Sequence, residues 1–338
     1  MKAIIKTISE MTGFSQSTVS NALNNKGRVS AATSEKIRET ARNLGYYKEY
    51  QEKSRKLKFV IFRKNGQIVD TTPYFQLLVS GAEKECRELG LEMSIQNLDK
   101  RDQDFELRVR SLKRNTTDGI IILGNEMEDD DYSLIEGIKA PLLVIDYMKD
   151  DRSFNSIMSN NTESAMGATE YLVAMGHRQI GYIRGEFRIK PFIERSRGWQ
   201  LAMHRYKIPI EKKFIITLPT TMDGAYKKMK EYLEKRPPLP TGFFVDNDII
   251  ALGVIKALNE MGYRVPDDIS LVGYDDLPYS AVSQPALTTI RVGKEEMGRI
   301  AVRRLYDVMT HNEPCLYLQI ELCTSFIERD SVRDIRGL

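Results

Sequence analysis

The chain has 338 residues, of which 41% are hydrophobic and 29% charged, so two or three domains with sizeable cores are expected. No apolar run approaches the ~20 residues that a membrane-spanning helix needs. The start, MKAIIKTISE, also lacks the apolar stretch of a secretory signal. The three cysteines show no CxxC spacing, which favours a reducing compartment. We therefore expect a cytoplasmic globular protein without a membrane span.

The net charge of +3 is unevenly distributed along the chain. Residues 1–58 contain 12 Lys or Arg and 5 Asp or Glu, a balance of +7. The remaining residues contain 38 and 42, a balance of −4. A small basic region ahead of a mildly acidic body is typical of a head that meets a polyanion. A solvated charged surface gives the same balance, so charge alone does not decide between the two.

Three short helices are predicted within residues 1–46. The first covers residues 4–11 and is ended by Gly13, because glycine accepts the left-handed conformation at a helix terminus. Ser15 opens the second helix as an N-cap, and Ser30 or Thr33 caps the third. The residues expected to face the interior are Ile8, Met11, Val19, Ala22, Leu23, Ile37, Ala41 and Leu44.

Two helices joined by a short turn form a helix-turn-helix, whose second helix enters the major groove of DNA. The second helix here carries uncharged hydrogen-bonding side chains, the chemistry that reads base edges. Capping alone would explain Ser15 but not the polar run after it. The residues of this run predicted to contact DNA are Ser15, Gln16, Ser17, Thr18, Ser20, Asn21 and Asn24, with Gln16, Ser17 and Asn21 reading bases and Ser15, Thr18 and Ser20 contacting phosphates.

The segment GFSQSTVSNALNNKGRVSAATSEKIRETARNLGY resembles the DNA-binding head of the lactose-repressor/galactose-repressor family of bacterial regulators. The run S-x-x-T-V-S-x-A-L-N, followed by V-S and L-G-Y, carries the resemblance. In that family, base reading is assigned to the positions held here by Gln16, Ser17 and Asn21. The resemblance implies a transcriptional repressor of carbohydrate-utilisation genes. It would bind a near-palindromic double-stranded operator as a homodimer, with half-sites about one helical turn (~34–36 Å) apart.

Residues 47–57 are expected to form a charged linker of unusual composition. Family members carry there a hinge motif, A-R-x-L, whose leucine wedges into the minor groove, whereas this chain has Glu52-Lys53-Ser54-Arg55. Without the leucine, we expect weaker operator bending than is usual in the family. Either Lys53 and Arg55 follow the phosphates, or the segment is a flexible tether. The sequence leaves both interpretations open.

From residue 58 onward, short apolar strands alternate with amphipathic helices. Nearly continuous apolar runs such as LKFVIF, GIIIL, PLLVID and GFFVD are typical of parallel strands covered by helices on both faces. A second series begins near residue 157, so the core is predicted to be α/β with two doubly wound lobes. Helices are expected near residues 74–89, 105–112, 162–175, 194–206, 224–235 and 248–261.

The resemblance extends over almost all of the chain apart from the linker, through TPYFQLLVSGAEKECRELG, GHRQIGYI, the R-x-x-G-W that begins at Arg195, NDIIALGVIKALNEMGYRVPDDISLVGYDD and QPALTTIRVGKEEMG. The family core is similar to periplasmic sugar-binding proteins, with two lobes joined by three crossovers. This implies a helix-turn-helix domain at 1–46, a linker at 47–57 and an effector-binding and dimerisation core at 58–338. Lobe 1 is expected at about 58–158 plus 288–322, and lobe 2 at about 159–287 plus 323–338.

Polar residues follow several predicted strands, and ligands of such sheets bind outside the carboxyl ends of the strands. Each of these residues alone is often a helix cap, but together with an arginine they indicate a polar ligand such as a sugar. The resemblance implies that the effector is held by residues matching Asp146, Arg195, Asn247 and Asp275. With the residues at the start of the first core helix, the predicted effector site comprises Pro73, Tyr74, Phe75, Asp146, Arg195, Asn247 and Asp275.

The main rival is an enzyme that acts on a sugar or sugar phosphate and carries an accessory DNA-binding head. His177, His204 and His311 are scattered without metal-ligand spacing. No GxSxG, GxxxxGK[ST] or strand-linked GxGxxG occurs. We therefore expect no enzymatic activity, cofactor or metal site. A nucleobase or a phosphorylated metabolite remains an alternative effector, and a protein corepressor and a tetrameric state remain open.

Overall fold

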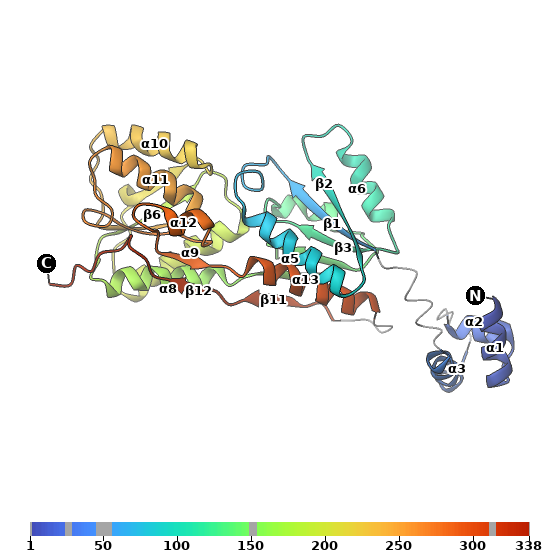
Figure 1. Ribbon diagram of the computed structural model, residues 1–338. Coiled ribbons are helices and arrows are strands. Elements are labelled where there is room, and N and C mark those ends of the chain that lie inside the picture. The colour runs from blue at the N-terminus through green and yellow to red at the C-terminus, as the bar shows by residue number, and fades with distance from the viewer. Residues whose placement is uncertain (1, 24–28, 45–55, 149–153, 311–315, 338) are drawn as a thin grey trace. The chain divides into compact units, whose positions relative to one another are not determined.

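The structure is a computed structural model that describes residues 2–23, 29–44, 56–148, 154–310 and 316–337. It divides into two compact units, Met1–Lys56 and Leu57–Leu338, each considered by itself (Figure 1). Three residues predicted to contact DNA lie outside the described residues, namely Asn24, Lys53 and Arg55.

The first unit consists of three helices, α1 (Lys2–Thr12), α2 (Gln16–Leu23) and α3 (Ala31–Asn43). Ser15 Oγ accepts a hydrogen bond from the Thr18 N–H at 3.1 Å, which confirms Ser15 as the N-cap of α2. Ser30 Oγ accepts from the Thr33 N–H at 3.2 Å, so Ser30 rather than Thr33 caps α3. The core of this unit contains Ile8, Val19, Ala22, Ile37 and Ala41.

Two residues predicted to be inward in this unit are exposed, Met11 and Leu44. Successive helical residues are about 100° apart, and the buried face of α1 runs through Ile8 and Thr12. Viewed along the helix, Thr12 lies to one side of Ile8 and Met11 to the other, so Met11 is at the edge of the buried face and points to solvent. Leu44 follows the last residue of α3, so the inward face of that helix does not continue to it.

The second unit begins with a six-stranded sheet in the order β11-β5-β4-β3-β1-β2. Its strands are β1 (Lys56–Arg63), β2 (Glu92–Asp99), β3 (Gly119–Leu123), β4 (Leu142–Ile145), β5 (Asn155–Ser159) and β11 (Gln319–Leu322). The pairs β1–β3, β3–β4, β4–β5 and β5–β11 are parallel. Phe59 pairs with Ile121 on one face and Val60 with Ile122 on the other, so both faces are buried. We call this sheet and its helices lobe 1.

Helices α5 (Tyr74–Glu88) and α13 (Lys294–Thr310) pack against each other on one face of lobe 1, and α6 (Phe105–Arg114) covers the other (Figure 1). Glycine permits the close crossing of α5 and α13. A Cβ atom on Gly81 would lie 2.0 Å from the Glu295 carbonyl oxygen, and one on Gly298 would lie 2.1 Å from the Leu78 carbonyl oxygen. The short elements η1 (Asp129–Asp131) and α7 (Tyr132–Ile135) complete the lobe.

A second sheet, in the order β7-β6-β8-β9, forms lobe 2. Its strands are β6 (Ile180–Gly185), β7 (Ile215–Leu218), β8 (Gly242–Val245) and β9 (Ser270–Val272). Helices α8 (Asn161–Ala174) and α9 (Lys190–Arg205) cover one face, and α10 (Met222–Glu234) and α11 (Asp248–Glu260) cover the other. The short helices η2 (Lys212–Phe214) and α12 (Pro278–Val282) lie in its loops. All pairs in this sheet are parallel, so the predicted α/β fold with parallel sheets in both lobes is confirmed.

Within the described residues, the chain passes between the two sheets three times. It leaves lobe 1 after β5, returns through β10 (Thr289–Arg291) into α13, and leaves again after β11 through β12 (Ser325–Ile327). Strands β10 and β12 pair antiparallel. One hydrophobic core continues across both lobes, so the lobes are in apolar contact. In the part of the chain that the structure describes, no helix is long and apolar enough to cross a membrane.

Candidate functional site

The exposed face of α2 carries the polar residues predicted to read DNA. Gln16 and Ser17 are exposed, whereas Val19 and Ala22 are buried. The other polar residues of the helix, Thr18, Ser20 and Asn21, are half-buried. The Ser15 hydroxyl lies 2.8 Å from the hydroxyls of both Ser17 and Thr18, so three hydroxyls cluster at the N-terminus of α2. This end of a helix presents free N–H groups and favours anionic oxygens.

Six of the seven residues predicted to bind the effector line one small cavity between the lobes of the second unit. They are Tyr74, Phe75, Asp146, Arg195, Asn247 and Asp275. Pro73 does not line this cavity and lies instead on a larger groove, because the chain turns into α5 at this point. The cavity has a volume of about 20 Å³, which leaves room for roughly one water molecule. A sugar-sized ligand enters only if the lobes separate.

The polar residues of this cavity stand where parallel strands end. Asp146 follows β4, Asn247 lies just beyond β8, and Asp275 lies just beyond β9. The carboxyl ends of these strands face one cleft, so residues distant in sequence converge there. Asp146 (φ 58°) and Asp275 (φ 113°) both have positive φ, a region that non-glycine residues seldom adopt. Such conformations cluster at ligand-binding sites.

Arg195 of α9 is the buried centre of this site. Its Nε donates to Asn161 Oδ1 at 2.9 Å, Nη1 to the Asp246 carbonyl oxygen at 2.7 Å, and Nη2 to Asp275 Oδ1 at 3.2 Å. The guanidinium carbon lies 3.6 Å from the centroid of the Tyr274 ring. These contacts hold the planar fork of the arginine in a single orientation.

Asp146 approaches the same arginine from lobe 1. Burial raises the pKa of its carboxyl to about 7, with the positive charge of Arg195 opposing this rise and the negative charge of Asp275 adding to it. Buried carboxylates are normally paired or hydrogen-bonded. The position of Asp146 at the cavity wall makes its oxygens available to a ligand that donates hydrogen bonds.

The sequence analysis missed one supporting residue and six residues that line the cavity, namely Ile68, Thr72, Asn125, Ile189, Pro191 and Phe192. Asn125, just beyond β3, lines the cavity, and its Oδ1 is buried with no hydrogen-bond partner among the described residues. Phe192 of α9 also lines the cavity. Asn161 orients Arg195 from the start of α8. Asn125 carries the same strand-end signal as Asp146, so that signal could have found it.

Several other residues near the cavity have side chains that already make contacts within the protein. Asn247 Oδ1 accepts from the Ile250 N–H at 3.0 Å and so caps α11, which leaves its amide nitrogen for the cavity. The Asp246 carboxylate pairs with Arg188 and accepts from the Tyr182 hydroxyl, and Asp246 does not line the cavity. Trp199, which ends the R-x-x-G-W motif, is buried and stacked on Tyr182 with ring centroids 5.2 Å apart. In the described parts of the chain, no group of three or more His, Cys, Asp or Glu could hold a metal ion.

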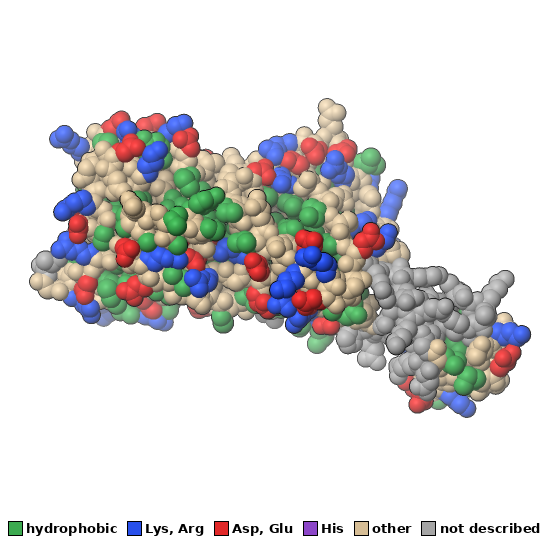
Figure 2. All heavy atoms as spheres, viewed as in Figure 1, with side chains coloured by type: hydrophobic (Ala, Val, Ile, Leu, Met, Phe, Trp, Pro, Cys, Tyr) green, Lys and Arg blue, Asp and Glu red, His purple; other side chains and the backbone are tan. Residues whose placement is uncertain are grey.

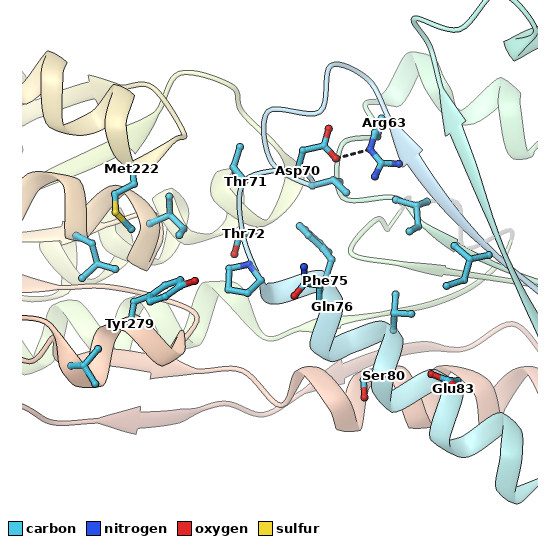
Figure 3. Close-up of a pocket in the computed structure, with 18 of the residues that line it drawn as sticks. Arg63, Asp70, Thr71, Thr72, Phe75, Gln76, Ser80, Glu83, Met222 and Tyr279 are labelled. Carbon is cyan, nitrogen blue, oxygen red and sulfur yellow. Dashed lines mark hydrogen bonds and ion pairs between the residues drawn. The ribbon is translucent and has the colours of Figure 1, made fainter.

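A larger groove of about 1220 Å³ runs along one face of the second unit and is lined by both lobes. Figure 3 shows Thr71 and Thr72 of lobe 1 facing Met222 and Tyr279 of lobe 2, with Glu83 further along α5. Hydrophobic side chains gather in the middle of this face (Figure 2). The exposed apolar residues that line the groove are Ile95, Met222, Tyr279 and Val282. Contiguous exposed apolar surface of this kind marks an interaction site.

Comparison with known proteins gives matches over both units. The model described as "Bacterial regulatory proteins, lacI family" matches residues 4–49, and that of a "Periplasmic binding protein-like domain" matches residues 169–332. The HTH-type transcriptional repressor PurR of Haemophilus influenzae (strain PittEE) is 30% identical over 338 residues. That alignment covers 98% of this chain and 99% of the relative.

Solved structures agree at the level of the fold. A transcriptional regulator CelR–cellobiose complex superimposes with a TM-score of 0.73 at 23% identity, covering 97% of this chain and 99% of that one. The lac repressor dimer bound to operator and the anti-inducer ONPF superimposes with a TM-score of 0.70 at 24% identity, covering 96% and 98%. Both the head and the two lobes therefore have counterparts in the folds of these single chains.

Asp146→Asn is expected to stabilise the protein at high pH. The folded-state pKa of Asp146 is raised to about 7, whereas an unfolded aspartate ionises near pH 4. The unfolded chain therefore loses this proton first, and stability falls as pH rises through about 4–7. Asparagine removes that loss and accepts the positive φ. Urea unfolding at pH 8 should show a gain on the order of 1–4 kcal/mol that shrinks toward pH 4.

The exposed Asp130 provides the control, because Asp130→Asn makes the same substitution at a residue that remains in solvent. The control should show no gain that depends on pH. The raised pKa of Asp146 would be contradicted if the difference in unfolding free energy between Asp146→Asn and the unaltered chain were the same at pH 4 and pH 8.

Proposed function

Because this chain belongs to the lacI family of bacterial regulatory proteins, we propose that it represses transcription by binding operator DNA and responds to a small effector held between its lobes. The family assignment confirms the expectation of a DNA-binding regulator rather than an enzyme. The observation that carries the proposal is the joint presence of a polar, exposed recognition helix and a buried polar cavity between two lobes. Because operator DNA lies in the bacterial cytoplasm, the chain is proposed to act there.

The proposed division of labour follows the two units. Residues 1–46 bind DNA, the linker ends where β1 begins at Lys56, and the remainder senses the effector and dimerises. Gln16 and Ser17, which are exposed on α2, are available to read base edges in the major groove. The hydroxyl cluster at Ser15 lies at the end of α2 that favours phosphate.

The chemistry of the cavity supports a neutral effector that donates hydrogen bonds. Three nitrogens of Arg195 already donate to protein oxygens. The acceptors that a ligand can meet include the Asp146 carboxyl group and the Asn125 amide oxygen. An anionic phosphate would meet two buried carboxylates, because Asp275 also faces the cavity. We therefore propose an uncharged, hydroxyl-rich ligand such as a sugar and disfavour a phosphorylated one.

The apolar groove supports a homodimer. It is lined by both lobes and contains four exposed apolar side chains. The lac repressor, which shares this fold, has a solved structure as a dimer bound to operator. We propose that a second copy of this chain covers the groove, since a two-fold dimer places two heads on the two half-sites of a near-palindrome.

Gln16→Ala is expected to relax base preference at one position in each half-site. Its amide can make two hydrogen bonds to a base edge, worth about 1–3 kcal/mol of discrimination. Selection from a random duplex library with the full chain would identify the preferred sequence. Anisotropy titrations against single-base variants of that duplex would then measure the loss. Gln200→Ala, at an exposed position on α9, is the control and should leave the preference unchanged.

Uncharged sugars are expected to raise the melting temperature, because a ligand that binds only the folded state stabilises it. The probes are cellobiose, glucose and glucose 6-phosphate, the last two differing by the phosphate alone. We expect the shift with at least one uncharged sugar and none with the phosphate. Asn125→Ala removes an acceptor without a protein partner and should abolish the shift at little cost to folding. A shift produced by glucose 6-phosphate alone would contradict the assignment.

Val282→Asp is expected to convert the dimer to a monomer. Val282 is 77% exposed in the groove, so the substitution leaves folding intact but buries a carboxylate at the proposed interface. Sedimentation velocity would show the change in mass. Leu107→Asp provides the matched control, because Leu107 on α6 is 68% exposed and lies away from the groove. Equal masses for the two variants would argue against this face.

A further inference from the structure

The loop between β1 and α5, residues 64–73, is organised around one buried carboxylate. Glu126 follows β3 and is 0% exposed. Its Oε2 accepts hydrogen bonds from three backbone N–H groups and its Oε1 accepts from two more. The donors are Lys64 (2.9 Å), Asn65 (3.1 Å), Gly66 (2.9 Å), Ile68 (2.9 Å) and Val69 (3.1 Å).

This arrangement fixes the loop through a residue that is 60 positions away in sequence. Hydrogen bonds to an ionised acceptor are stronger than those between neutral groups, and five of them converge on a single side chain here. Gly66 has a φ of +74°, which lets the backbone turn so that N–H groups on both sides of Gln67 point at Glu126. Arg101 adds a hydrogen bond to the Asn65 carbonyl oxygen at 2.9 Å. These hydrogen bonds therefore hold the loop in a defined conformation as part of lobe 1.

The same loop reaches lobe 2 and forms part of the effector cavity. Thr220, which is buried just beyond β7, donates from Oγ1 to the Gln67 carbonyl oxygen at 3.1 Å. Ile68 and Thr72 line the effector cavity. The outer side of the loop, at Thr71 and Thr72, lines the groove opposite Met222 (Figure 3).

We propose that residues 64–73 form a latch across the cleft, with Glu126 as the positioning residue that presents the Gln67 carbonyl group to Thr220. This inference rests on the proposed effector site, because the latch forms one wall of that cavity. A cavity of about 20 Å³ admits a sugar only after the lobes separate, and separation breaks the Gln67–Thr220 hydrogen bond. Glu126 thus controls entry and closure without touching the effector.

Hydrogen exchange on the full chain, without DNA or sugar, tests the latch. Thr220→Val keeps the shape of the side chain but removes the donor, and the Gln67 carbonyl oxygen keeps the Thr71 hydroxyl at 3.1 Å as a partner. We expect exchange to become at least tenfold faster in residues 68–75 and 186–193, which form the two walls of the cavity. Residues 225–233 of α10 should keep their rates, because opening is local. Thr217→Val, at an exposed position on β7, is the matched control and should change none of these segments.

Glu126→Gln tests the positioning role. Glutamine replaces one acceptor oxygen with an NH₂ group, so either two or three of the loop N–H groups lose their partner. We expect at least tenfold faster exchange in residues 64–69 and, in addition, in both cavity walls. Adding Thr220→Val to this variant should increase exchange in the two walls only slightly further, because both substitutions release the same latch. Glu128→Gln removes an exposed partner of Lys64 and should leave the walls unchanged.

Three results would overturn the latch. The first is unchanged exchange of both walls in Thr220→Val. The second is loss of protection confined to residues 64–69 in Glu126→Gln, which would make Glu126 purely structural. The third is a uniform increase that includes α10, which would indicate global destabilisation. Because these measurements need neither operator nor sugar, their failure is distinguishable from failure of the DNA and melting experiments.

Discussion

The arrangement of the cleft depends on the buried guanidinium group of Arg195. It bonds Asp275 in lobe 2 directly and faces the carboxyl group of Asp146 from lobe 1. Two ionised carboxylates in one small buried space repel each other unless a positive charge lies between them. The Tyr274 ring, 3.6 Å from the guanidinium carbon, and Asn161 keep that charge in place. Arg195 is therefore the cation in the cavity lining around which these polar contacts are arranged.

Burial disfavours the ionised form of both carboxyl groups, and the pKa of Asp146 is raised to about 7 although the positive charge of Arg195 opposes the rise. This raised pKa shows that the ionised form is disfavoured in the closed arrangement. A binding-site residue held in an unfavourable state lowers the folding stability of a protein but can serve its function. A ligand hydroxyl that donates a hydrogen bond to this carboxylate would stabilise its ionised form. Closure of the lobes on an effector would then be favoured over closure without one, which is the differential binding that a switch requires.

The sequence predicted the fold well because hydrophobic periodicity determines it directly. Runs such as GIIIL became buried parallel strands, and Asp146, Asn247 and Asp275 lay at strand ends as expected. Arg195 was found through a motif. The residues that sequence reasoning missed act through contacts between distant segments, as Glu126 does with residues 64–69 and Asn161 with Arg195. No local pattern encodes such a contact, because it exists only once the lobes have formed.

The close crossing of α5 and α13 has a mechanical consequence. Because backbone atoms of each helix fill the space where a Cβ would stand on Gly81 and Gly298, the two helices are in direct backbone contact. Lys294, at the start of α13, donates to the Asp275 carbonyl oxygen at the cleft, and α5 lines the apolar groove. We therefore expect α5 and α13 to move together as one unit. A small rotation of the two helices at the cleft would then also displace the surface of α5 that lines the groove.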